Sequence, residues 1–169
     1  MTIIIDPQSS GIAGNMIIGA LVDLGADSAK LKEVMEYSAR EFGGVEVTFE
    51  KISKKGIAST FCHVEMNNRN HSICFNELVE KINELNLDKK VKSKSLKVFE
   101  RMAKAESKVH GKSLDEIHFH EVGASDAVAD VIGSISAYYE LELDRDKIIG
   151  LPIAVGGGTV KTAHGTIPV

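Results

Sequence analysis

Hydrophobic residues in the first quarter of the chain recur first at strand spacing and then at helical spacing. The β-branched run 2–5 is stopped by Asp6-Pro7, which predicts a short buried strand ending in a turn. After a loop rich in Ser and Gly, apolar residues at helical spacing over 15–24 predict a helix that Gly25 ends. A second helix is predicted over 27–42.

The middle of the chain changes from an alternating pattern back to a helical one. Apolar and polar residues alternate over 45–50, and the composition of 59–66 is strand-like, so we expect an antiparallel pair. Apolar residues then recur at helical spacing over 75–85, and again within the mostly charged stretch 87–110. Two consecutive helices are therefore predicted.

The last third combines extended segments with one strongly apolar helix. Residues 117–121 have the pattern of an extended segment, 127–141 that of a buried helix, and 147–155 that of another strand. The interleaved elements predict the fold class α/β (α+β), as a single compact domain over 1–169. Within it we expect a mixed β-sheet of about four to five strands covered by helices.

Composition restricts the class of protein. The 169 residues are 43% hydrophobic, which is enough for one sizeable core or two small ones, and the 20 basic and 24 acidic residues are spread along the chain. With a net charge of -4, this distribution argues against a nucleic-acid partner. The apolar run at the start is too short for a signal sequence or membrane span, so we expect no membrane partner and a cytoplasmic location.

The two cysteines do not form a disulfide framework. Cys62 and Cys74 have no Cys-x-x-Cys spacing, although Cys62-His63 with His71 and Cys74 has the composition of a metal-binding quartet. Both cysteines lie in apolar contexts. We therefore interpret them as core thiols of a reducing compartment.

His118 and His120 are the strongest candidates for chemistry. In an extended segment their imidazoles point to one face, and Phe119 points to the other, toward a core. Neutral imidazoles suit nickel, zinc, copper and iron, and Glu121 or Asp126 could complete a mixed nitrogen and oxygen shell. A hydrogen-bonded pair on the surface is the alternative interpretation of an isolated His-x-His.

Asp126 and Asp130 follow on the apolar helix. They are four residues apart and so project from the same face. A structural interpretation has Asp126 capping the helix and Asp130 pairing with a lysine. Alternatively, both carboxylates belong to the metal site, as ligands or as partners that orient the ligating histidines.

Two glycine-bearing loops are candidate anion sites. The first follows the first strand, where open α/β sheets place ligand groups, and its amides can bind an anion. A structural turn capped by Asn15 explains this loop as well. The second has bare backbone that could approach a phosphate, and a hinge explains it equally well. The candidate residues are Asp6, Ser10, Gly11, Gly14 and Asn15 in the first loop, and Gly156, Gly157, Gly158 and His164 in and after the second.

Four blocks of the sequence occur in an order and spacing that resemble one protein family, the LarC family. The match extends upstream of the histidine pair to Ala105-Glu106 and His110-Gly111. The four blocks are Asp6-Pro7 with 10–16; 118–124 with Asp126 and Asp130; Leu151-Pro152 with 156–158; and Thr162-Ala163-His164-Gly165.

The resemblance implies a nickel-insertion lyase, also described as a cyclometallase. Such an enzyme places Ni²⁺ into pyridinium-3,5-bisthiocarboxylic acid mononucleotide, forming the nickel-pincer nucleotide cofactor of lactate racemase. CTP, with Mg²⁺ or Mn²⁺, is consumed. In this chain, His118 and His120 would hold nickel, Glu121 or Asp126 would be an oxygen ligand or the base for the ring proton, and Asp130 would complete the metal site. The two glycine-bearing loops would hold the nucleotide phosphate.

Two departures from the family pattern bear on function. Family members carry an aspartate where this chain has Asn15, which removes a charge but keeps a helix-capping group. Family sequences also continue past the position of Val169 into a C-terminal domain that binds CTP. We therefore interpret the chain as a LarC-like N-terminal domain without the C-terminal CTP-binding domain. A fragment, a split-gene product and a stand-alone homologue all fit this pattern, and the resemblance implies that insertion requires the C-terminal domain.

Two other functional classes stay open at this point. A metal-dependent hydrolase or lyase would use the same histidines on another small substrate, without CTP. A nickel chaperone or assembly module would bind the metal but form no pincer cofactor. The apolar helix over 127–141 suits either a core or the interface of a homo-oligomer.

Overall fold

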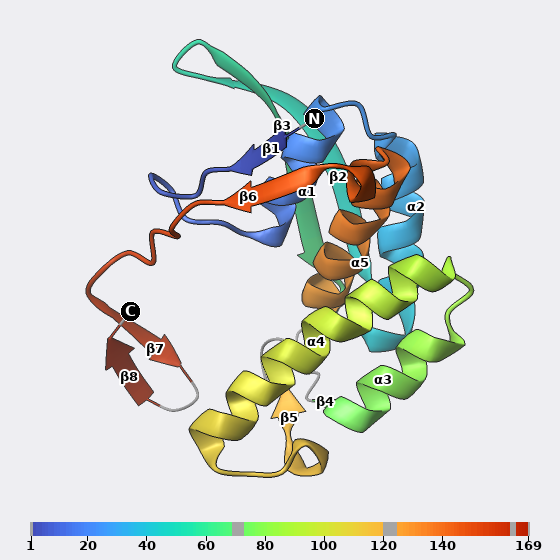
Figure 1. Ribbon diagram of the computed structural model, residues 1–169, viewed down its shortest axis with the longest axis vertical. Helices are drawn as coiled ribbons and strands as arrows, with labels where there is room; N and C mark the ends of the chain where they lie inside the picture. Colours follow the sequence, from blue (N-terminus) through green and yellow to red (C-terminus); the bar gives the residue numbers. More distant parts are fainter. Residues whose placement is uncertain (1, 69–72, 120–124, 163–164, 169) are drawn as a thin grey trace. The chain divides into compact units, whose positions relative to one another are not determined.

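The computed structural model describes residues 2–68, 73–119, 125–162 and 165–168, and helices and short strands alternate along them (Figure 1). The mixed α/β class is confirmed. The chain forms two compact units, one comprising Met1–Ala13 with Asp144–Val169 and the other Gly14–Leu143.

The first unit contains two pairs of strands. β1 (Thr2–Ile5) lies parallel to β6 (Lys147–Gly150), and β7 (Thr159–Thr162) pairs antiparallel with β8 (Gly165–Pro168). The predicted first strand is present, but the expectation that it is buried is wrong, because Ile4 and Ile5 are 63% and 38% exposed. The last predicted strand is shorter than expected because Pro152 lacks the N–H that a strand ladder needs.

The second unit contains the long helices. Its antiparallel hairpin matches the predicted strand pair, and each predicted helix is present within one to three residues of its expected bounds. The elements are α1 (Gly14–Asp23), α2 (Ser28–Ala39), η1 (Arg40–Phe42), β2 (Val45–Lys54), β3 (Ile57–Met66), β4 (Ile73–Cys74), α3 (Phe75–Glu84), α4 (Lys89–His110), η2 (Leu114–Glu116), β5 (His118–Phe119) and α5 (Ser125–Glu140); η3 (Leu143–Arg145) follows.

The strands differ from the expected single sheet of four to five strands. Among the described residues they form four separate two-stranded sheets. β4 and β5 have two residues each and β1 and β6 four each, so each offers few ladder hydrogen bonds. These strands are also separated along the chain by helices, and each pairs with one partner.

Local sequence signals explain where the elements begin and end. Asp27 caps α2 by accepting hydrogen bonds from two backbone N–H groups, and Asp88 caps α4. α4 ends at Gly111 in the left-handed conformation. Lys55 and Gly56, with φ of 51° and 83°, form the two-residue turn of the β2–β3 hairpin, as a type I′ turn requires.

α5 lies at the centre of the second unit, and Figure 1 shows it beside α1, α2 and α4. One core cluster combines Val128 and Ile132 of α5 with side chains of α3, α4 and β5. The other combines Ala129 and Ala137 of α5 with side chains of α1, α2, β2 and β3. α5 is therefore buried on two faces, which explains why apolar residues predominate in its sequence.

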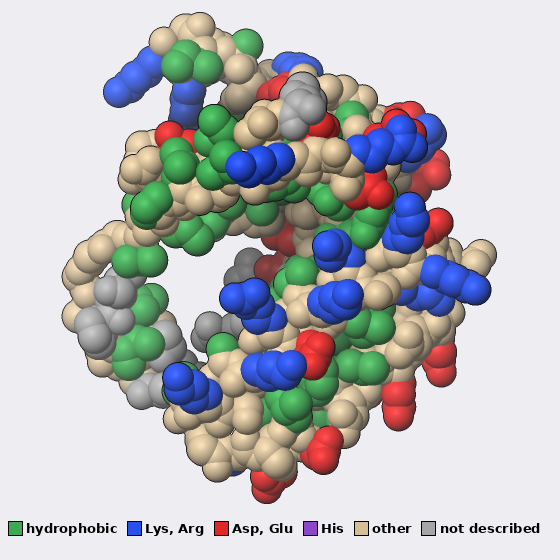
Figure 2. All heavy atoms as spheres, in the orientation of Figure 1, with side chains coloured by type: hydrophobic (Ala, Val, Ile, Leu, Met, Phe, Trp, Pro, Cys, Tyr) green, Lys and Arg blue, Asp and Glu red, His purple; other side chains and the backbone are tan. Residues whose placement is uncertain are grey.

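α4 carries a concentration of positive charge that the composition did not predict. Figure 2 shows Lys and Arg side chains gathered over this helix. Among the described residues, no helix is long and apolar enough to cross a membrane, and α4, the longest, is strongly charged. The exposed basic residues that recur every three or four positions along it are Lys90, Lys94, Lys97, Arg101, Lys104 and Lys108.

α1 is held tightly against β3. A Cβ added at Gly19 would clash with the carbonyl oxygen of Thr60. One turn on, the Asp23 carboxylate accepts hydrogen bonds from the Thr60 backbone N–H at 2.7 Å and from its hydroxyl at 2.6 Å. The hydrogen bond from Lys51 and those from Thr60 lower the pKa of Asp23 to about 2. Glycine at 19 is what allows the close approach.

We predict that Gly19→Ala lowers the free energy of unfolding by about 1–3 kcal/mol, because the new methyl group must displace backbone rather than a flexible side chain. Urea unfolding measures the change. Gly157→Ala is the matched control, since a Cβ there meets no atom within 4 Å and should leave stability nearly unchanged. Equal stability of the Gly19→Ala variant and the parent would contradict the close packing.

Candidate functional site

His118 lies on the exposed side of the short strand β5. Its neighbours Ile117 and Phe119 are buried, with 2% and 1% of their surface exposed, and Phe119 makes an edge-to-face contact with Phe75. The predicted opposition of an outward imidazole and an inward phenyl ring is confirmed for these residues. His120 and Glu121 lie outside the described residues.

The two cysteines have different environments. Cys62 is buried in the core, as expected, and burial together with the charge of Asp130 raises its pKa to about 12. Cys74 is only half-buried, and its Sγ accepts a hydrogen bond from the N–H of Glu77 at the start of α3. The interpretation as a core thiol therefore holds for Cys62 and is wrong for Cys74.

Asp126 and Asp130 lie one turn apart on α5, as the spacing predicted. The Asp126 carboxylate accepts a hydrogen bond from the N–H of Ala127 at 2.7 Å, a local contact at the start of the helix. Asp130 accepts a hydrogen bond from the backbone N–H of Asn15, and no lysine among the described residues pairs with it. Its second oxygen, Oδ1, is buried and accepts no hydrogen bond from the described residues.

The environment of Asp130 favours its protonated form. Burial raises its pKa to about 6, the negative charge of Asp126 acts in the same direction, and the hydrogen bond from Asn15 opposes both. A carboxyl group in this range exchanges its proton near neutral pH. Asp130 therefore has an acid–base character that spacing alone could not reveal.

Asp130 packs directly against the beginning of α1. A Cβ added at Gly14 would lie 2.5 Å from Asp130 Oδ2, so only glycine leaves room for the carboxylate. The side-chain amide of Asn15 donates to the carbonyl oxygen of Cys62, at 3.3 Å. An aspartate, which the family resemblance leads us to expect at 15, has no hydrogen to donate there. Asparagine thus ties α1 to β3 and avoids a further negative charge near Asp130.

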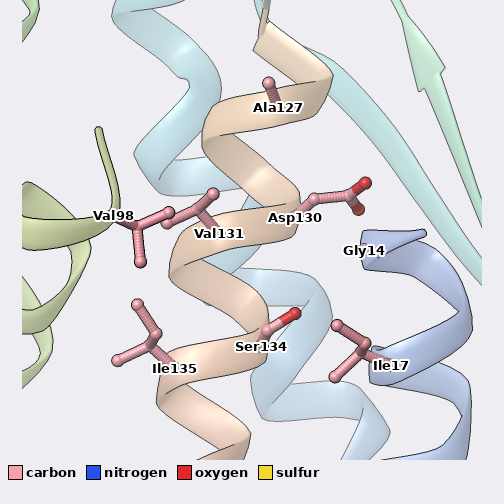
Figure 3. A pocket seen from close by; sticks show the side chains of 8 residues that line it. All are labelled: Gly14, Ile17, Val98, Ala127, Asp130, Val131, Ser134 and Ile135. Carbon is pink, nitrogen blue, oxygen red and sulfur yellow. The ribbon is translucent and has the colours of Figure 1, made fainter. Parts of the chain in front are cut away.

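A cavity of about 320 Å³ opens beside this carboxylate, between α1, α4 and α5. Figure 3 shows Asp130 and Ser134 on α5, with apolar side chains around the rest of the lining. A cavity of this kind suits a small, mostly apolar group that presents one polar atom to the carboxylate. The lining residues are Gly14, Ile17, Val98, Ala127, Asp130, Val131, Ser134 and Ile135.

The other predicted site residues belong to the first unit. Because β1 and β6 are parallel, the loops that follow them leave the same edge of the sheet. The carbonyl oxygen of Pro7 accepts hydrogen bonds from the N–H groups of Gly11 and Ala154, which joins the two loops. Asp6 is exposed, and its Oδ1 accepts from the N–H of Gln8 at 3.1 Å.

The glycines of these loops adopt conformations that other residues rarely adopt. Gly11, Gly156 and Gly158 have φ of 71°, 81° and 95°. Ser10 is exposed, as are all three glycines over 156–158. His164 lies outside the described residues. The first unit therefore joins Asp6, Ser10 and Gly11 of the first predicted anion loop to the second loop, whereas Gly14 and Asn15 belong to α1 in the second unit.

The described candidates thus form three groups: His118 on β5, the pair Asp126 and Asp130 with the start of α1, and the two loops of the first unit. Within 2–68, 73–119, 125–162 and 165–168, no three or more His, Cys, Asp or Glu side chains converge on one point. The predicted metal ligands are therefore still predictions. Pattern analysis missed the position of Cys74, because a two-residue strand carries no periodicity.

Comparison with known proteins places the chain in a family. The family profile described as "Nickel insertion protein" matches residues 3–169. No solved structure gives a significant match.

Three relatives show the extent of the similarity. A candidate nickel insertion protein of Methanosphaera stadtmanae is 47% identical over the whole chain and 43% of its own length. One from Methanothermobacter thermautotrophicus is 46% identical over the whole chain and 42% of its length. The pyridinium-3,5-bisthiocarboxylic acid mononucleotide nickel insertion protein of Desulfitobacterium hafniense is 39% identical over 95% of the chain and 39% of its own length.

The chain spans about two fifths of the length of these relatives. The profile nevertheless covers nearly all of the chain, including every candidate residue discussed above. This chain belongs to the nickel insertion protein family.

Proposed function

We propose that the chain takes part in inserting Ni²⁺ into pyridinium-3,5-bisthiocarboxylic acid mononucleotide, the reaction named for the relative from Desulfitobacterium hafniense. The observation that carries this proposal is the exposed imidazole of His118, which the buried Phe119 anchors, in a chain whose residues 3–169 match the family. An accessible imidazole on a rigid support is a suitable nickel ligand.

In the proposed reaction nickel is cargo, so the site must bind the ion and then release it. His118 and His120 supply neutral imidazole nitrogens to Ni²⁺. The pyridinium carbon–hydrogen bond breaks and a nickel–carbon bond forms, while the released proton passes to a carboxylate. Glu121 or Asp126 serves as that base or as an oxygen ligand of nickel.

The surroundings of Asp130 favour a role other than the predicted one of metal ligand. Its carboxylate faces the start of α1 and lines the cavity, and its pKa of about 6 lets it take up or release a proton near neutral pH. We assign it to holding a proton beside the bound substrate. Ser134, one turn further on α5, is the other polar side chain lining this cavity.

The two loops of the first unit are the proposed phosphate site of the mononucleotide. Gly11 and Gly156 to Gly158 have no side chains that would block a phosphate from reaching the backbone N–H groups. The Ser10 hydroxyl is exposed beside them, and His164 follows the second loop in sequence. Asp6 is acidic, so its part is to hold the first loop through Gln8 rather than to contact the phosphate.

In this proposal, nickel insertion also requires CTP, a divalent cation and a C-terminal domain. The resemblance to the LarC family implies that CTP is consumed with Mg²⁺ or Mn²⁺ and is bound by a C-terminal domain. The chain spans about two fifths of the length of its relatives. We place the reaction in the cytoplasm, where the thiols of Cys62 and Cys74 stay reduced.

Replacing His118 and His120 together by alanine should abolish nickel binding, because both imidazole donors are lost. Isothermal titration calorimetry with NiCl₂ under reducing conditions measures the affinity. His63→Ala is the matched control, since His63 is an exposed imidazole on β3 and has no part in the proposed site. An unchanged nickel affinity in the double variant would rule out the assignment.

The raised pKa of Asp130 predicts how stability depends on pH. Its folded pKa of about 6 exceeds the ordinary aspartate value of 3.8, so the folded state binds the proton more tightly, and stability should fall as pH rises from about 4 to about 6. Asp130→Asn should flatten this dependence in urea unfolding, while Glu33→Gln, at an exposed position of α2, should keep it. Parallel pH profiles of Asp130→Asn and the parent would show that burial does not perturb this carboxyl group.

A further inference from the structure

β4 and β5 bring together two residues that are far apart in the sequence. Ile73 pairs with Phe119, and Cys74 pairs with His118. Ile73 and Phe119 are both buried in the same core cluster. Because successive side chains of a strand point to opposite faces, Cys74 and His118 share the other face, away from that cluster.

The register fixes how close these two side chains are. The N–H of Phe75 donates to the carbonyl oxygen of Ile117 at 3.0 Å, which marks Phe75 and Ile117 as a hydrogen-bonded pair of the antiparallel ladder. The neighbouring pair, Cys74 and His118, is therefore a non-hydrogen-bonded one. Such pairs have Cα atoms about 4.5 Å apart and the closer side chains of the ladder.

Both side chains are accessible. His118 is exposed and Cys74 is half-buried. The sulfur of Cys74 accepts a hydrogen bond from the N–H of Glu77, at 3.4 Å, in the first turn of the ten-residue helix α3. N–H groups at a helix start interact favourably with negative charge, so this position suits a metal-bound thiolate.

We propose that Cys74 and His118 form a sulfur–nitrogen pair that binds the Ni²⁺ cargo. This proposal deepens the proposed function and rests on it. Thiolate and imidazole are donors that suit nickel over Mg²⁺ or Ca²⁺, which select oxygen ligands. Together with His120 of the proposed function, Cys74 and His118 make three protein donors, which still leave coordination positions for water and for the sulfur atoms of the thiocarboxylate substrate, as transfer of the ion requires.

Cys62 provides an internal control for this inference. It is the other cysteine of the chain, it is 1% exposed, and burial holds its pKa near 12. A nickel–thiolate signal from this protein should therefore arise from Cys74 alone. Cys74→Ser is the sharpest variant, because serine keeps a side-chain acceptor for the N–H of Glu77 and removes the sulfur.

The test is an anaerobic titration of the whole chain with NiCl₂ and a thiol-free reductant. Near-ultraviolet sulfur-to-nickel charge-transfer absorption and calorimetric affinity are read together. The parent and Cys62→Ala should show the absorption band. Cys74→Ser and His118→Ala should lose affinity by about tenfold or more, Cys74→Ser should also lose the band, and both should keep the circular dichroism of the parent.

The outcomes separate this inference from the proposed function. Parent-like affinity and absorption in Cys74→Ser would overturn the sulfur ligand, and the proposed function would stand if the double histidine variant still lost nickel. A thiolate band in a chain that yields no pincer cofactor, even with the C-terminal domain and CTP, would support the site and overturn the function. A parent that binds no nickel would overturn both.

Discussion

The burial of α5 between two core clusters is the packing interaction on which the rest of the second unit depends. Its Val128 and Ile132 contact the side chains that hold α3, α4 and β5, and its Ala129 and Ala137 contact those of α1, α2 and the β2–β3 hairpin. The same helix carries Asp126 and Asp130. Because the helix is fixed from both sides, its carboxylates are held in one orientation against the beginning of α1.

Burying the Asp130 carboxylate with one oxygen that lacks a hydrogen bond lowers the stability of the fold. The residues around it show how the fold accommodates this group. Gly14 leaves the space, and the backbone N–H of Asn15 donates one hydrogen bond at the positive end of α1. The second oxygen accepts no bond from the described residues. Buried carboxylates with an unsatisfied oxygen are typical of sites that exchange protons or bind ligands. We therefore assign Asp130 the role of holding a proton.

Sequence patterns predicted the helices, the strands and the side of a strand to which a residue points. They did not predict contacts between segments that are far apart in the sequence. Periodicity predicted the helices, the β2–β3 hairpin and the opposition of His118 and Phe119, because each depends on local spacing. It did not predict the contact of Asp130 with Gly14 or the pairing of Cys74 with His118, which arise from tertiary packing. The prediction of a single sheet was wrong because the composition of a short strand does not determine which other strand it pairs with.

The proposed nickel site is the face shared by Cys74 and His118, which Ile73 and Phe119 support from the core below. X-ray absorption spectroscopy at the nickel edge of the nickel-loaded chain tests this claim most directly. We expect a nickel shell that contains histidine imidazole and one sulfur. A shell of oxygen donors alone, with neither imidazole nor sulfur, would contradict it.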